Sequence, residues 1–188
     1  MPSFRSIAAL LAFFALLALS ACAPPPETVA PPAAASGPYR LAGGDRLRII
    51  VFGQDNLSNS YSVDGSGMIS MPLIGRVHAQ GLTTAELEAS VAARLAQGYV
   101  REPSVSAEVE AYRPFFVLGE VAAAGQYPFV SQMTAQNAVA IAGGFTPRAV
   151  EGAVEITRVI DGKSATFAAP LLYPVRPGDT ITVQERFF

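Results

Sequence analysis

Short runs in which apolar and polar residues alternate make up much of this 188-residue chain. Successive side chains of a β-strand point to opposite faces of a sheet, so such runs predict strands with one buried face. Leu47, Ile49 and Val51 form one such run, and another follows Pro103. Two stretches have helical spacing instead. The predicted fold class is therefore α+β, with short strands and few helices.

The two helical stretches carry recognisable end signals. The sequence TTAE at 83–86 matches a capping box, in which a Thr side chain and a Glu side chain bind each other's backbone N–H groups. Gly98 can close this helix. The second helix is predicted from Thr134, as its N-cap, to Gly143.

Two small units follow from this pattern, one at residues 39–112 and one at 113–172, with a closing strand at 173–188. Hairpin turns are predicted at Asp64-Gly65 and Asp161-Gly162, because these dipeptides tolerate the positive φ angles of tight turns. Each unit alone would have a marginal core. We therefore expect the two units to pack together or against neighbouring subunits.

The chain uses almost the same phrase twice, as GGDRLRIIVFG from Gly43 and as PGDTITVQERF from Pro177. Glycine permits unusual φ angles and an Asp carboxylate accepts backbone hydrogen bonds, so Gly44-Asp45 and Gly178-Asp179 are predicted as structural turns that lead into strands. The alternative is a pair of catalytic acids for glycoside cleavage, which requires carboxylates roughly 5 to 10 Å apart. Nothing in the sequence indicates that the two acids converge.

The N-terminal 21 residues have the character of a secretory signal peptide, with Arg5 followed by an apolar run. That run is shorter than the roughly 20 residues of a stable transmembrane helix. Leu19-Ser20-Ala21-Cys22 is similar to the lipobox of bacterial lipoproteins, and Cys22 is the only cysteine in the chain. A lone exported cysteine cannot form an internal disulfide, so we predict lipid attachment at Cys22 and membrane binding through acyl chains.

Residues 22–38 are rich in proline and alanine and are predicted to form an extended tether. Without Arg5, the 13 basic residues become 12, against 15 acidic ones, which gives the mature chain a net charge of −3. It has no basic block long enough to bind nucleic acid. Nucleic acid is therefore not expected as a partner.

Several sequence blocks resemble, in order, the polysaccharide export family of bacterial capsule and exopolysaccharide exporters. In the first unit these are the Gly-Asp turn, VDGSGMISMPLIG, GLTTAELE and PSVSAEV. In the second unit, VLGEV, GQYPF, AIAGGFT and ITR are similar to the family's soluble-ligand-binding β-grasp (SLBB) domain. The resemblance implies a polysaccharide export domain at 39–112 followed by an SLBB domain at 113–172.

The resemblance also implies a function. Family members form homo-oligomeric rings on the periplasmic side of the outer membrane of Gram-negative bacteria, and their rings enclose a water-filled vestibule. The expected partners are an extracellular polysaccharide and an inner-membrane polysaccharide co-polymerase. Larger members carry a further β-grasp domain and a C-terminal amphipathic helix, which this sequence lacks before Phe188, so a separate outer-membrane barrel is expected. The alternative is a periplasmic β-grasp module that binds a soluble glycan without forming a conduit.

Enzyme motifs are absent from the sequence: there is no phosphate loop, nucleophile elbow or metal-ligand cluster. His78 is the only histidine, and Cys22 is already assigned to lipid. We therefore predict no catalytic residues, no metal and no cofactor. The charged residues Arg46, Arg48, Glu108 and Glu110 are interpreted as solvated strand faces rather than as a site.

Overall fold

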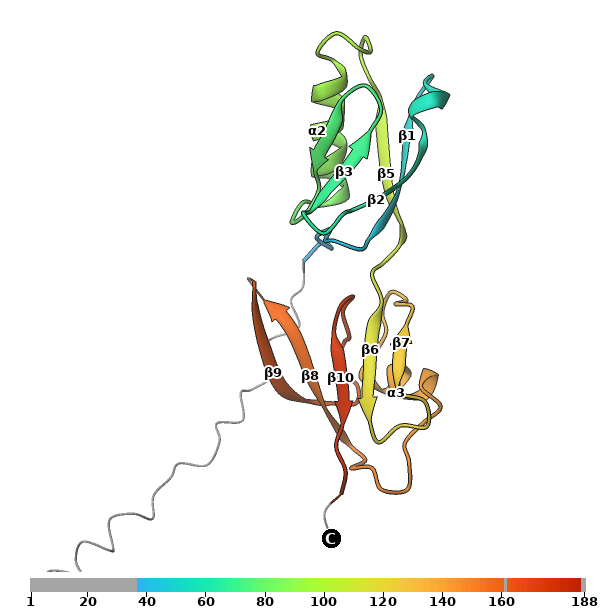
Figure 1. The fold of residues 1–188 in the computed structure, drawn as a ribbon, viewed down its shortest axis with the longest axis vertical. Helices are drawn as coiled ribbons and strands as arrows, with labels where there is room; N and C mark the ends of the chain where they lie inside the picture. The colour runs from blue at the N-terminus through green and yellow to red at the C-terminus, as the bar shows by residue number, and fades with distance from the viewer. Residues whose placement is uncertain (1–36, 161, 187–188) are drawn as a thin grey trace, which may run out of the picture.

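The computed structural model describes residues 37–160 and 162–186 of the chain. This part has the α+β class, and its two units lie one beyond the other along the long axis (Figure 1). The predicted signal peptide, Cys22 and the tether up to residue 36 lie outside the described residues. Within the described ranges, no helix is long and apolar enough to cross a membrane.

The first unit combines a three-stranded antiparallel sheet, in the order β2-β1-β5, with a separate hairpin and one long helix. The sheet is formed by β1 (Arg46–Val51), β2 (Asn59–Ser62) and β5 (Val105–Ala111). The remaining elements are a 3-10 turn η2 (Asp55–Leu57), the hairpin strands β3 (Met68–Met71) and β4 (Gly75–His78), and α2 (Thr84–Leu95).

The apolar face of β1 packs against the core of the first unit. Leu47, Ile49 and Val51 are at most 1% exposed, which confirms the predicted one-sided strand. The capping box of α2 is also confirmed. The Thr83 hydroxyl accepts from the Glu86 N–H (3.2 Å), and the Glu86 carboxylate accepts from the Thr83 N–H (2.7 Å).

The hairpin predicted at Asp64-Gly65 is wrong. The strand β2 pairs with β1 and β3 pairs with β4, so the strands on either side of this turn are not partners. Asp64 Oδ1 instead accepts from the Ser66 hydroxyl (2.6 Å) and from the Met68 N–H (2.9 Å), and these bonds lower the pKa of Asp64 to about 2. The positive φ of the loop falls on Gly67 (78°). The Asp64 side chain therefore closes a wider loop that redirects the chain from one sheet to the other.

The second unit is a five-stranded sheet in the order β7-β6-β10-β8-β9. Its strands are β6 (Phe115–Gly119), β7 (Gly125–Tyr127), β8 (Ala153–Ile160), β9 (Lys163–Pro170) and β10 (Thr180–Val183). The strand β10 is parallel to β6 and antiparallel to β8. The segment that the sequence sets apart as a closing strand therefore lies in the middle of this sheet.

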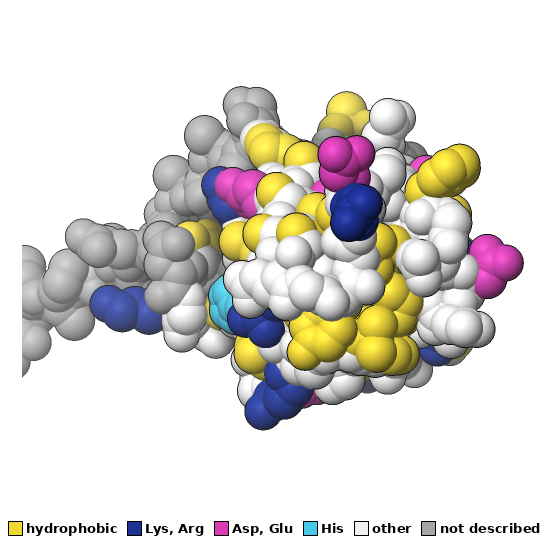
Figure 2. All heavy atoms as spheres, turned by 90° about the horizontal axis from the view of Figure 1, so that it is seen from above, with side chains coloured by type: hydrophobic (Ala, Val, Ile, Leu, Met, Phe, Trp, Pro, Cys, Tyr) yellow, Lys and Arg dark blue, Asp and Glu magenta, His cyan; other side chains and the backbone are white. Residues whose placement is uncertain are grey.

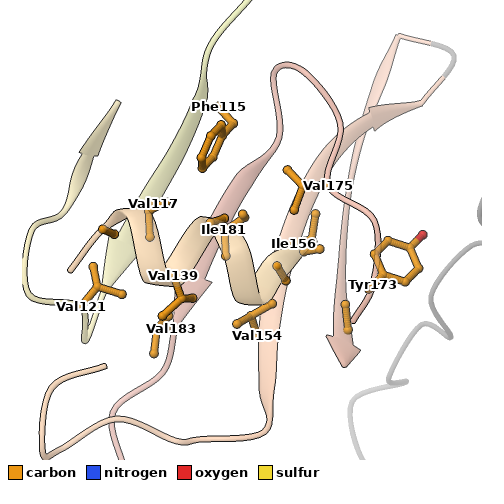
Figure 3. Close-up of a cluster of buried hydrophobic side chains, with 14 of the residues drawn as sticks. Phe115, Val117, Val121, Val139, Val154, Ile156, Tyr173, Val175, Ile181 and Val183 are labelled. Carbon is orange, nitrogen blue, oxygen red and sulfur yellow. The ribbon is translucent and has the colours of Figure 1, made fainter. Parts of the chain in front are cut away.

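One helix, α3 (Ala135–Ile141), covers a single face of the second sheet (Figure 3). Val139 of α3 belongs to the same buried cluster as Phe115 of β6 and Ile181 of β10. The expected N-cap is confirmed, because the Thr134 hydroxyl accepts from the Asn137 N–H in a second capping box. The predicted β8–β9 hairpin is also confirmed, since Ile160 pairs with Lys163.

Gly119 at the end of β6 has a φ of 84°, and a Cβ added there would overlap the carbonyl oxygen of Val183 in β10. We expect Gly119→Ala to lower the free energy of unfolding by more than about 3 kcal/mol, because overlap adds to the strain of about 1 to 3 kcal/mol from the positive φ. Urea unfolding followed by circular dichroism measures this loss. The sample is the soluble mature chain, which begins at residue 22 and carries Cys22→Ser.

Gly81→Ala is the matched control. Gly81 has a similar φ of 78°, but a Cβ added there meets no atom within 4 Å. This variant therefore retains the backbone strain without the overlap. Equal losses in the two variants would contradict the packing of β6 against β10.

Candidate functional site

Each Gly-Asp phrase folds into a turn with a buried carboxylate. Asp45 is 0% exposed, and its Oδ2 accepts from the Ala42 N–H (2.8 Å) and from the Tyr39 hydroxyl (2.7 Å). The Asp45 N–H donates back to the Ala42 carbonyl (3.1 Å). Gly44 precedes the acid with a φ of 93°, a conformation that L-residues rarely adopt.

The second turn repeats this hydrogen-bond pattern. Asp179 is 1% exposed, its Oδ2 accepts from the Arg176 N–H (2.7 Å), and its own N–H donates to the Arg176 carbonyl (3.1 Å). Gly178 has a φ of 84°. In both turns the acid is bound by the residue three positions earlier, so the repeated phrase corresponds to a repeated local structure.

The two acids differ in their arginine partners. Arg158 of β8 donates from Nε and Nη2 to the two Asp179 oxygens (2.9 and 2.7 Å), and the pair is almost fully buried. Burial alone would lower the pKa of Arg158, but its hydrogen bonds with Asp179 and the carboxylate charge outweigh burial and raise it. The guanidinium also lies 5.5 Å from the Tyr173 ring centroid, within the range of a cation–π contact.

The arginine partner of Asp45 is Arg113, which lies between β5 and β6. The Arg113 N–H donates to Asp45 Oδ1 (2.9 Å), and its Nη1 lies 3.0 Å from the Tyr39 hydroxyl and 3.7 Å from Asp45 Oδ2. Burial and the hydrogen bond to Asp45 raise the pKa of Tyr39 well above its usual value. The first acid is thus bound by the segment that leads into the second unit.

Arg113 contacts both Gly-Asp turns. A Cβ added at Gly44 would lie 3.3 Å from the Arg113 Cβ, and one added at Gly178 would lie 2.6 Å from the Arg113 Nε. The absence of a side chain at both glycines therefore makes room for Arg113. Pro114 adds a further link, because its carbonyl accepts from the Gly178 N–H (3.0 Å). Arg113 and Pro114 therefore connect the two Gly-Asp turns, and we call this pair the joint.

A cavity of about 810 Å³ lies beside this joint. Its walls come from the segment before β1, the residues between β5 and β6, the loop before α3, the end of β8 and the loop before β10. Tyr39, Tyr112 and Phe129 line one side in a chain of edge-to-face contacts, with centroids 4.9 and 5.4 Å apart. Among the described residues that line it, four are arginines and one, Asp179, is acidic.

The comparison with known families follows the same division of the chain. Residues 33–110 match the family described as polysaccharide biosynthesis/export protein, and residues 114–168 match the SLBB domain. The chain belongs to the polysaccharide export family and carries an SLBB domain. The first unit is the export domain, and the second contains the SLBB domain.

Two relatives of this chain have names that describe a function. It is 33% identical to the exopolysaccharide production protein ExoF of Rhizobium meliloti over 118 residues, which are 56% of this chain and 28% of ExoF. It is 28% identical to the EPS I polysaccharide export outer membrane protein EpsA of Ralstonia nicotianae over 194 residues, which cover 84% of this chain and 50% of EpsA. The chain therefore spans half or less of the length of these relatives.

The contacts made by Arg113 lie where the two family matches meet. The matches leave out residues 111–113, and Arg113 is the residue that binds the export-domain acid and contacts the turn before β10. Sequence reasoning missed Arg113 and Arg158. The available signal was weak: Arg113 stands before Pro114 at the unit boundary, and Arg158 ends the ITR block.

The other residues singled out in the sequence lie apart from the cavity lining. His78 is exposed at the end of β4, and Arg46, Arg48, Glu108 and Glu110 are exposed on β1 and β5. Cys22 lies outside the described residues. Within residues 37–160 and 162–186, no group of three His, Cys, Asp or Glu side chains could hold a metal ion.

The alternative interpretation of Asp45 and Asp179 as glycosidase acids finds no support in this geometry. Neither carboxylate is more than 1% exposed. Each accepts hydrogen bonds from its own turn and from an arginine. A catalytic pair would need to face a substrate across a cleft.

The different partners of the two acids lead to a prediction. Asp179→Asn leaves the guanidinium of Arg158 buried without its counter-charge, and we expect a loss of about 3 to 5 kcal/mol in the free energy of unfolding. Asp45→Asn affects Arg113, whose side chain is 28% exposed, and should cost only about 1 to 2 kcal/mol. Urea unfolding of the soluble mature chain measures both. A larger loss for Asp45→Asn would contradict the assignment of Asp179 to the buried pair.

Proposed function

We propose that this protein is a component of the apparatus that exports capsule polysaccharide or exopolysaccharide. The single observation that carries the proposal is the match of the two successive domains to the export family and to SLBB. The names of ExoF and EpsA, which refer to exopolysaccharide production and to polysaccharide export, support it. The proposed location is the periplasmic side of the outer membrane, with acyl chains on Cys22 as the anchor.

The proposed mechanism is passage of a hydrated polymer rather than chemistry on it. The two buried acids of the Gly-Asp turns are bound within the fold and are not free to act on a substrate. The outward face of the first sheet carries charges of both signs, with Arg48 of β1 directly opposite Glu108 of β5. Such a face remains hydrated, and weak contacts with water and sugar hydroxyls would let a polymer move on.

The proposed assembly is a ring of identical copies that works with an inner-membrane polysaccharide co-polymerase. A head-to-tail contact between identical copies forms a ring when its rotation closes. Two surfaces offer apolar contacts for this purpose. The sheet face opposite α3 exposes Phe116 (39%) and Leu118 (46%), and loops at the far end of the export domain expose Phe52 (82%), Leu73 (58%) and Tyr99 (54%). Figure 2, which looks onto this end, shows hydrophobic side chains gathered at the surface.

The oligomeric state tests the ring. We expect the soluble mature chain to sediment as a closed oligomer several times the mass of a single mature chain. Leu118→Glu places a charge on the open sheet face and should shift the protein towards monomers. Ile141→Glu is the matched control, because Ile141 is equally exposed (47%) but lies on α3.

A wild-type monomer at the concentration found in cells would contradict the ring. If that monomer bound a short glycan tightly, the second candidate function, a periplasmic glycan-binding module, would be favoured. Analytical ultracentrifugation and a glycan titration on the same sample separate the two functions.

Deletion of the coding sequence tests the export role. We expect polysaccharide in the medium and on the cell surface to fall at least about tenfold, because this export path would lack its periplasmic component. Complementation with the wild-type gene is the control. Normal secretion by the deletion strain would remove the export role.

The same strain complemented with Cys22→Ser tests the anchor. Without acyl chains, the protein is expected to leave the outer-membrane fraction and to appear in the soluble periplasm. A variant that remains fully in the outer-membrane fraction would show that something other than Cys22 holds it there.

A further inference from the structure

We propose that the cavity between the export domain and the second unit binds a short stretch of acidic polysaccharide, in which sugar rings carry carboxylate groups. The proposal deepens the proposed export function and rests on it for the choice of a glycan. It assigns a ligand class to a surface that lies apart from the exposed strand faces. The cavity volume of about 810 Å³ lies within the range of known small-ligand sites, roughly 300 to 1,000 Å³.

The charge of the lining favours an anion. Asp179 is the one acidic residue among the described lining residues, and both its oxygens accept hydrogen bonds from Arg158. Arg176 lines the cavity near this pair. Its partial burial and the neighbouring Arg158 charge lower the pKa of Arg176, which indicates that the two positive charges repel each other. A ligand carboxylate placed beside them would reduce this repulsion.

Arginine also suits this ligand geometrically. The planar guanidinium presents paired N–H groups that match the two oxygens of a carboxylate. Arg40 at the rim lies 3.6 Å from Glu86, but both side chains are more than half exposed. Exposed pairs of this kind contribute little, so a ligand carboxylate can compete for Arg40.

The aromatic side of the cavity favours sugar rings over a simple anion. Tyr39, Tyr112 and Phe129 are partly buried and contact one another edge to face while they line the cavity. The C–H face of a sugar ring is apolar and can pack on an aromatic ring, while hydroxyl groups at the ring edge reach polar neighbours. Gln132, in the same loop as Phe129, has a φ of 65°, and strained residues of this kind cluster at ligand sites.

The joint at Arg113 holds these walls in place before a ligand arrives. Tyr39 and Tyr112 lie on the export-domain side, whereas Phe129 and Arg176 lie in the second unit. Because Arg113 binds Asp45 and packs against Gly178, the two sides keep a fixed separation. Binding to a preformed site avoids the cost of ordering it.

A nuclear magnetic resonance titration of the soluble mature chain tests the site. The probe is α-1,4-linked trigalacturonate, and maltotriose is the neutral trisaccharide for comparison. We expect saturable shifts of the Tyr112, Gln132 and Arg176 amides with trigalacturonate, and binding at least about tenfold weaker for maltotriose. Shifts that map away from the cavity, an absence of saturable shifts, or equal binding of the neutral sugar would overturn the proposal.

Variants sharpen the test. Arg176→Gln and Tyr112→Leu should each weaken trigalacturonate binding at least about fivefold. Arg101→Gln is the matched control for charge, because Arg101 is exposed in the α2–β5 loop and is not among the cavity lining residues. Unchanged affinity in both cavity variants would overturn the site. The wild-type shift map decides the question even if a variant fails to fold.

The binding test and the secretion test distinguish a failure of the cavity site from a failure of the export role. Lost secretion on deletion together with no trigalacturonate binding would remove the cavity site and leave the export role. Cavity-mapped binding by a protein whose deletion leaves secretion unchanged would remove the export role and leave the site.

Discussion

Two buried carboxylates, one on each side of the domain boundary, constrain this structure more than any other feature. A buried charge without partners costs several kcal/mol, so each acid must be surrounded by donors. Asp179 obtains them from its own turn and from Arg158 within the same unit. Asp45 has donors in its own turn, but it also takes one from Arg113, the residue that leads into the second unit. The hydrogen bonding of one acid therefore links the export domain to its neighbour.

This link gives the domain boundary its shape. Arg113 lies beside Gly44 and Gly178, where any side chain would crowd the arginine. The edge-to-face ring contacts from Tyr39 through Tyr112 to Phe129 cross the boundary next to Arg113. The cavity lies at this joint, with walls from both sides. A fixed boundary with arginines and aromatic rings is well suited to weak, repeated contact with a passing polymer. It fits the proposed export role better than it fits a catalytic one, because both buried acids are already bound.

Local signals in the sequence predicted much of the fold. The alternation in β1, the two capping boxes and the β8–β9 hairpin depend on residues close in sequence, and the structure confirms them. The hairpin predicted at Asp64-Gly65 is wrong because strand pairing depends on more than the local sequence. The strand β2 pairs with the preceding strand β1, and the Asp64 carboxylate accepts hydrogen bonds within a wide loop. The cavity could not be predicted for the same reason. The two Gly-Asp phrases are visible in the sequence, but their meeting at Arg113 depends on how both units fold.

The rigidity of this joint is tested most directly by residual dipolar couplings of the backbone amides in partially aligned soluble mature chain. If Arg113 holds the two units together, couplings from residues on both sides of it fit a single alignment tensor with the observed arrangement of the units. Two independent tensors of different magnitude would show that the units move separately, and the cavity would then not be a fixed site.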